Sequence, residues 1–227
     1  MNYDVQKIES RAKTPRAAAI AGILFSLLLI TGMVLVRISV PSDPQDAGEW
    51  LPVNAQRVSL ALNLVPFAGI AFLWFMGVVR DRLGSSEDRF IATVFLGSGL
   101  LFLATLFAAA AIAGATISLS AARAGTLLGT DVYAFGRSLT YEIMNVYAMK
   151  MAGVFMLTTC TLALRTGILP RWMAFLGMAL ALILLLTLGF LSWAPLLFPL
   201  WILLISVHIL LANLRRTGDG PSGSVVQ

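Results

Sequence analysis

Six apolar stretches, each long enough to cross a membrane, constrain the fold of this chain more than any other feature of its sequence. A helix rises about 1.5 Å per residue, so about 20 residues cross a hydrocarbon core of about 30 Å. A chain in lipid must satisfy its own backbone hydrogen bonds, and the alternating ten-residue pattern of barrel strands is missing. We therefore expect an all-α polytopic bundle of six transmembrane helices, over residues 17–38, 58–79, 89–117, 138–164, 172–191 and 195–214.

The composition agrees with lipid as the solvent for most of the chain. Of the 227 residues, 59% are hydrophobic and 12% are charged, whereas soluble domains average about 45–50% and about 25%. The net charge is +5, but the basic residues are spread over short connections and do not gather beside aromatic side chains. This distribution argues against a nucleic-acid partner and leaves the lipid bilayer as the expected one.

The distribution of Lys and Arg predicts the orientation of the helices, because cytoplasmic connections carry the excess of basic residues. Eleven of these residues fall on the side of the N-terminus, and four fall in the connections on the opposite side. Both termini are therefore expected to be cytoplasmic. The four basic residues on the outer side are Arg37, Arg57, Arg123 and Arg137.

The sequence divides into a membrane domain and two short flanking segments. Residues 1–16 carry mixed charge and are predicted to form a cytoplasmic N-terminal segment, in which an interfacial helix is slightly favoured over disorder. Residues 17–214 form the predicted six-helix transmembrane domain. Residues 215–227 are rich in Gly and Ser and are expected to be a disordered cytoplasmic tail.

Small residues in the third predicted span indicate close helix packing. Helices in lipid approach through such residues, and several of those in this span stand four apart on one face. Packing within the chain is the favoured interpretation, and a homodimer seam or another membrane subunit is the alternative. The residues are Gly97, Gly99, Ala104, Ala108, Ala109, Ala110, Ala113 and Gly114.

A group of polar residues intrudes on the fourth span, around Glu142 and Lys150. Ionisable groups in a membrane helix cost about 2.5–3.5 kcal/mol each on insertion scales, so by default they face the bundle interior. Counted by helical rise from the outer side, Lys150 lies roughly 18 Å deep and His208 of the sixth span roughly 20 Å deep. These depths predict a ligand-binding or proton site between the second, fourth and sixth spans, lined by Asn63, Glu142, Asn145, Tyr147, Lys150 and His208.

A structural role is the stronger alternative for the same residues. A membrane lysine can extend its amine toward the interface or bond to backbone carbonyls, and a lone histidine is more often a satisfied interior group than a ligand. Pro66 frees the carbonyl of Leu62, so Asn63 is more simply explained as filling that gap. We therefore favour structural roles for the group, with the ligand or proton site kept as a hypothesis.

No cofactor, metal site or catalytic residue is expected. One Cys and one His rule out thiolate metal cages and paired imidazole ligands within one chain. A retinal Schiff base at Lys150 would need a close carboxylate, and Glu142 lies about two helical turns away.

The run Arg165-Thr166-Gly167-Ile168-Leu169-Pro170-Arg171-Trp172, followed by Gly177, resembles a connection found in small six-span bacterial membrane proteins of actinobacterial type. These proteins are grouped as a domain of unknown function. The entry to the first span, residues 16–22, is also similar to theirs. The resemblance implies a multi-pass protein of the bacterial inner membrane, and it transfers no catalytic residue.

The sequence thus predicts a non-enzymatic membrane protein that handles a small molecule or ion, or that serves as a membrane subunit of an assembly. The alternative is a membrane-embedded or lipid-modifying enzyme that uses the polar residues of the fourth and sixth spans.

Overall fold

A computed structural model gives the fold of residues 2–41, 46, 48–83, 89–123, 126–186 and 193–218. Side chains are described from Arg16 onward within these ranges, except at 81–83 and 216–218. Every regular element in the described ranges is helical, which confirms the all-α prediction. The helices are α1 (Asn2–Ser39), α2 (Leu51–Leu83), α3 (Arg89–Ala122), α4 (Asp131–Glu142), the π-helix η2 (Ile143–Ala148), α5 (Met149–Thr166), α6 (Arg171–Leu186), the short 3₁₀-helix η3 (Ala194–Leu196) and α7 (Leu197–Gly218).

Five helical stretches are long and apolar enough to cross a membrane. They are Arg16–Ser39, Leu51–Arg80, Arg89–Ala122, Asp131–Thr166 and Ala194–Arg215. The fourth of them joins α4, η2 and α5 without a break. The sixth predicted span corresponds to α6, which has 16 described residues, and its expected continuation over 187–191 lies outside the described residues. A multi-pass helical membrane protein is therefore established in outline, and the count of six spans stays a prediction.

The flanking segments continue the helices of the membrane domain. Residue 2 already belongs to α1, so the predicted N-terminal segment runs into the first span without a break. At the other end α7 extends to Gly218, and residues 219–227 of the predicted tail lie outside the described residues.

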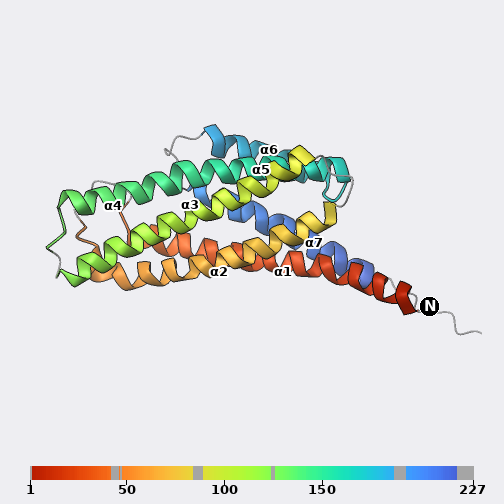
Figure 1. Ribbon diagram of the computed structural model, residues 1–227, viewed down its shortest axis with the longest axis horizontal. Coiled ribbons are helices and arrows are strands. Elements are labelled where there is room, and N and C mark those ends of the chain that lie inside the picture. Colours follow the sequence, from red (N-terminus) through yellow and green to blue (C-terminus); the bar gives the residue numbers. More distant parts are fainter. Residues whose placement is uncertain are drawn as a thin grey trace, which may run out of the picture.

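The helices lie roughly along the long axis of the molecule (Figure 1). α1 packs mainly against α2 and α7, and α5 packs mainly against α6 and α3. Figure 1 shows α6 on the outer side of α5, and α6 ends well before the far end of α4. The end of the bundle that holds Ser39, Trp50, Ala122 and Asp131 is called the Trp50 end below.

Buried phenylalanine rings join the five long helices, and Phe75 and Phe95 pack against the central five. α1, α2, α3, α5 and α7 each contribute one of the central five, and the ring centroids of Phe25 and Phe72 and of Phe102 and Phe198 lie 4.7 and 4.8 Å apart. Most pairs in the group are tilted or edge-to-face, the geometries in which aromatic quadrupoles attract. The central five rings, called the phenylalanine core below, are Phe25, Phe72, Phe102, Phe155 and Phe198.

The small residues of α3 point in two directions. Gly99 is buried and faces Met76 of α2 and Phe155 of α5, and Ala109 is buried as well. Ala104 and Ala108 are exposed. Part of the small-residue pattern therefore serves packing within the chain, and the homodimer seam stays a prediction for the exposed part.

Gly177 marks the closest approach of α5, α6 and α7. A Cβ at this position would lie 2.5 Å from the sulfur of Cys160 and 2.7 Å from Cε2 of Trp201, both of which are buried. Contacts this short force neighbouring side chains out of their packed positions.

We predict that Gly177→Ala lowers the free energy of unfolding by about 1–3 kcal/mol, the range for overpacking a filled core. Gly77→Ala on α2 is the matched control, because no atom lies within 4 Å of a Cβ there. Alanine also favours a helix over glycine by about 1 kcal/mol, so Gly77→Ala should not lower the melting temperature. Thermal melting in detergent measures both variants, and equal melting temperatures would contradict the packing described here.

Candidate functional site

A cavity of about 290 Å³, partly open to the outside, lies between the helices toward the Trp50 end, and its volume is near the lower limit of known ligand pockets, about 300 Å³. Its walls come from α1, α2, α3, α4 and η2, with Trp193 and the start of η3 closing one side. Interiors are normally packed as densely as organic crystals, so a void of this size needs a cause in the sequence.

Small side chains are that cause. Five of the wall positions carry Gly or Ala, and these leave space where larger residues would meet in the centre: Gly32, Ala61, Ala109, Ala110 and Ala113. At the inner end the floor consists of Leu29, Val65 and Leu106. Leu29 and Leu106 stand one helical turn beyond Phe25 and Phe102, so the phenylalanine core closes the cavity from below.

A second, smaller packed cluster lies at the Trp50 end. Leu51, Val58, Ile117 and Tyr133 are its buried members, and all four also line the cavity. The cavity therefore occupies the space between two packed regions.

The α1–α2 connection lies over this end and is fastened to α4 by Arg137. One guanidinium nitrogen donates to the carbonyl oxygen of Pro41 at 2.8 Å, and the other lies 3.6 Å from a carboxylate oxygen of Asp46 and 3.3 Å from the Tyr133 hydroxyl. The same guanidinium stands 6.0 Å from the centre of the Trp50 ring. Because its partners come from both the connection and α4, Arg137 holds the connection in place.

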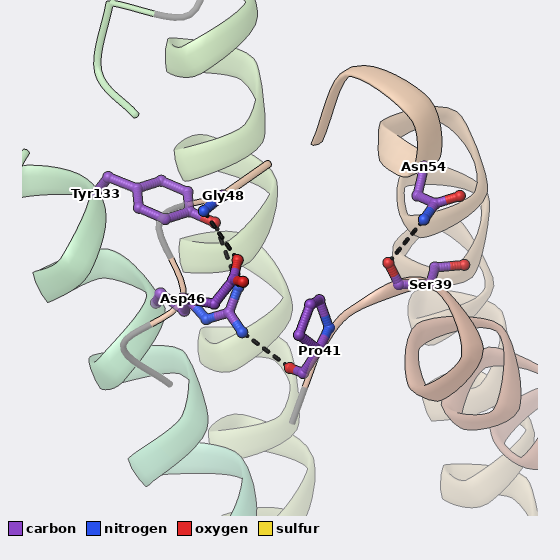
Figure 2. Close-up of polar contacts among 7 residues, drawn as sticks. Ser39, Pro41, Asp46, Gly48, Asn54 and Tyr133 are labelled. Atoms are coloured by element: carbon purple, nitrogen blue, oxygen red, sulfur yellow. Dashed lines mark hydrogen bonds and ion pairs between the residues drawn. The ribbon is translucent and has the colours of Figure 1, made fainter. Parts of the chain in front are cut away.

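Further contacts involve the described residues in and beside the connection (Figure 2). The Gly48 amide donates to Asp46 at 2.9 Å, and the Asn54 side chain donates to the Ser39 carbonyl at 3.0 Å. Gly48 has a φ of +93°, and a Cβ there would lie 2.7 Å from the Tyr133 ring. Only glycine satisfies both the backbone angle and the close approach.

Arg37 is the second cation on the cavity wall. It is half-buried near the end of α1, and its guanidinium stands 5.6 Å from the centre of the Trp193 ring. Together with Trp50, Tyr133 and Arg137 it forms the cavity's outer end, called the roof below.

The sequence prediction missed both roof arginines, because they were counted only as charges of the outer connections. One sequence feature could have indicated them. Arg37 and Arg137 lie at the same end of the predicted bundle as Trp50 and Trp193, and arginine pairs readily with aromatic faces.

The π-helix η2 occupies the part of the fourth span where the polar residues are concentrated. Such segments are rare, and they are frequent at functional sites. The side-chain amide of Asn145 donates to the carbonyl of Tyr141 at 2.9 Å, and both residues line the cavity. Asn145 is the one member of the predicted site that does so.

The other five predicted site residues lie elsewhere. Asn63, Glu142 and Tyr147 are exposed, and His208 is half-buried on α7. The described cavity therefore lies among the first four spans, whereas the sequence placed one between the second, fourth and sixth. A ligand or proton role for these five residues stays a prediction.

Lys150 bonds to a neighbouring helix. Its amine donates to the carbonyl of Leu185 at 3.4 Å, and Leu185 belongs to α6. A lysine amine within a membrane helix is costly without a partner, and a backbone carbonyl can serve as that partner. Gly153, one turn along α5, keeps the helices close, because a Cβ there would lie 3.1 Å from the Ala181 carbonyl. This geometry is the one expected of a structural lysine.

Comparisons with known proteins add no relative. No family model, no curated protein and no solved structure matches the chain. Within the described residues, no three His, Cys, Asp or Glu side chains gather as a metal site would require. The function proposed below therefore rests on the cavity and the charges at its roof.

We predict that Lys150→Met lowers the melting temperature by about 2–4 °C, the effect of about 1 kcal/mol in a chain of this size. The loss follows from removal of the hydrogen bond that joins α5 to α6. Glu142→Gln, at an exposed position of the same span, should melt like the wild type. Unchanged melting of Lys150→Met would remove the support for a structural role.

We predict that Arg137→Gln speeds amide hydrogen exchange in peptides covering residues 40–50 by about tenfold, because a hydrogen bond to a charged group contributes about 1.5 kcal/mol. Arg123→Gln, exposed at the same end, is the control and should leave the exchange rate unchanged. Equal rates in the two variants would show that Arg137 does not hold the connection.

Proposed function

We propose that this protein is a non-enzymatic, multi-pass protein of the bacterial inner membrane that binds a small, mainly apolar molecule in the cavity at its Trp50 end. The observation that carries the proposal is the cavity itself, about 290 Å³ with walls from four consecutive spans. Genuinely empty cavities in proteins are apolar, and those of sufficient size take up apolar ligands.

The shape of the site supports binding over mere loose packing. The floor rests on the phenylalanine core, and the roof is fastened by a specific set of contacts around Arg137. A packing defect would need no roof held by hydrogen bonds. The wall residues also come from two tightly packed clusters, so the space is bounded on both ends.

The proposed orientation follows from the distribution of basic residues. With both termini cytoplasmic, the Trp50 end lies on the outer side of the membrane. The cavity then lies in the outer half of the bundle, and the phenylalanine core lies on its inner side. The bacterial location rests on the resemblance of the connection over 165–172.

We predict that Ala113→Phe abolishes ligand uptake by filling the cavity from the α3 wall. The probe is decane carrying a photoreactive diazirine, added to the full-length protein in lipid nanodiscs, with labelled residues located by peptide mapping. Wild-type protein should be labelled at cavity-lining residues, and Ala113→Phe should lose that labelling while keeping labels on its lipid-facing residues.

Ala111→Phe is the matched control, because Ala111 lies two residues away on the exposed side of α3. It should retain wild-type labelling of the cavity. Labelling confined to lipid-facing residues in all three proteins would overturn the proposed function.

A further inference from the structure

The two ends of the cavity differ in chemistry. The floor consists of Leu29, Val65 and Leu106, whereas the roof carries the guanidinium groups of Arg37 and Arg137. Leu29 and Arg37 stand eight residues apart on α1, which corresponds to about 12 Å along the helix axis. The space thus runs from an apolar end to a cationic end over roughly the length of a short hydrocarbon chain.

The two arginines are not equivalent. Arg137 is engaged by the Pro41 carbonyl, the Asp46 carboxylate and the Tyr133 hydroxyl. Arg37 stands over the Trp193 ring and forms no hydrogen bond or ion pair with the described part of the chain. A guanidinium has five N–H donors, and a ring face satisfies none of them.

A half-buried cation whose N–H groups meet no partner among the described residues favours an anion. Removing a charge from water is costly unless a partner takes the place of the water, and charge-assisted bonds to carboxylate or phosphate are the strongest that arginine makes. The guanidinium carbon of Arg37 lies over the Trp193 ring, and a contact with a ring face uses none of the N–H groups that would bind such an anion.

We infer that the ligand is a single-chain amphiphile with an anionic head group, its head bound by Arg37 and its chain directed toward the phenylalanine core. This inference rests on the proposed function and specifies the class of molecule that the cavity takes. The volume of about 290 Å³ suits one chain rather than a whole two-chain phospholipid. Arg137 acts as a positioning residue that keeps the roof closed over the head group.

The test uses the full-length protein in phosphatidylcholine nanodiscs and the diazirine-labelled form of dodecanoate. Unlabelled dodecanoate and unlabelled 1-dodecanol compete for the cavity, and the two differ in the charge of the head group. In wild-type protein, dodecanoate should compete at about tenfold lower concentration than dodecanol, the effect of one charge-assisted contact. Equal competition by the two would overturn the inference.

Three variants assign the preference to Arg37. Arg37→Gln should remove the preference for dodecanoate, whereas Arg37→Lys should keep part of it because the charge remains. Arg57→Gln is the matched control, an exposed cation on α2 at the same end that does not line the cavity. A preference that survives in Arg37→Gln would overturn the role of this residue.

Two further comparisons complete the test. One distinguishes a lipid head group from a free amphiphile, and the other distinguishes failure of this inference from failure of the proposed function. Phosphatidylglycerol added to the nanodiscs should suppress dodecanoate labelling if a lipid head group with one inserted chain is the occupant, and should leave it unchanged if the occupant is a free amphiphile. If the decane probe labels the cavity but dodecanol competes as well as dodecanoate, the inference fails and the proposed function stands. If no probe labels the cavity, both fail.

Discussion

The interlocked rings of the phenylalanine core hold this bundle together. In lipid, helices gain little from the hydrophobic effect against one another, so association depends on close packing. Each of the five long helices supplies at least one ring, and the core rings of α1, α2, α3 and α7 all contact one another. The short helix α6 contributes no ring and is attached instead through Gly153, Gly177 and the bond from Lys150.

The cavity depends on the phenylalanine core and on the small residues that follow it along the helices toward the Trp50 end. Beyond the rings the walls change from Phe to Gly and Ala, and the helices stay apart because the second cluster spaces them at the Trp50 end. The roof contacts of Arg137 then determine how far the α1–α2 connection can move. A rigid floor and a tethered roof are suited to holding a small molecule in one orientation.

The fold class and most of the helix positions could be predicted from the sequence. A lipid environment permits few backbone structures, and the long apolar stretches show where the helices lie. The site could be predicted only in part. Asn145 was expected to line a cavity between the second, fourth and sixth spans, and it lines a mainly apolar cavity with other walls, because the depth of a residue along its helix does not tell which neighbour it faces. For Lys150 a bond to a backbone carbonyl was among the expected structural roles, but the sequence pattern could not tell that α6 supplies the carbonyl. Arg37 and Arg137 were assigned to connections. The sequence alone does not show whether an arginine side chain at the end of a span points to water or into the bundle.

The π-helix η2 has a consequence for the fourth span as a whole. A π turn contains about one residue more than an α turn, which rotates the residues that follow by about 100° relative to an unbroken α-helix. α4 is thereby set with Tyr133 and Arg137 toward the cavity, while α5 turns Phe155 into the core. The π turn thus lets one continuous span present a cavity-lining face in α4 and a core-packing face in α5.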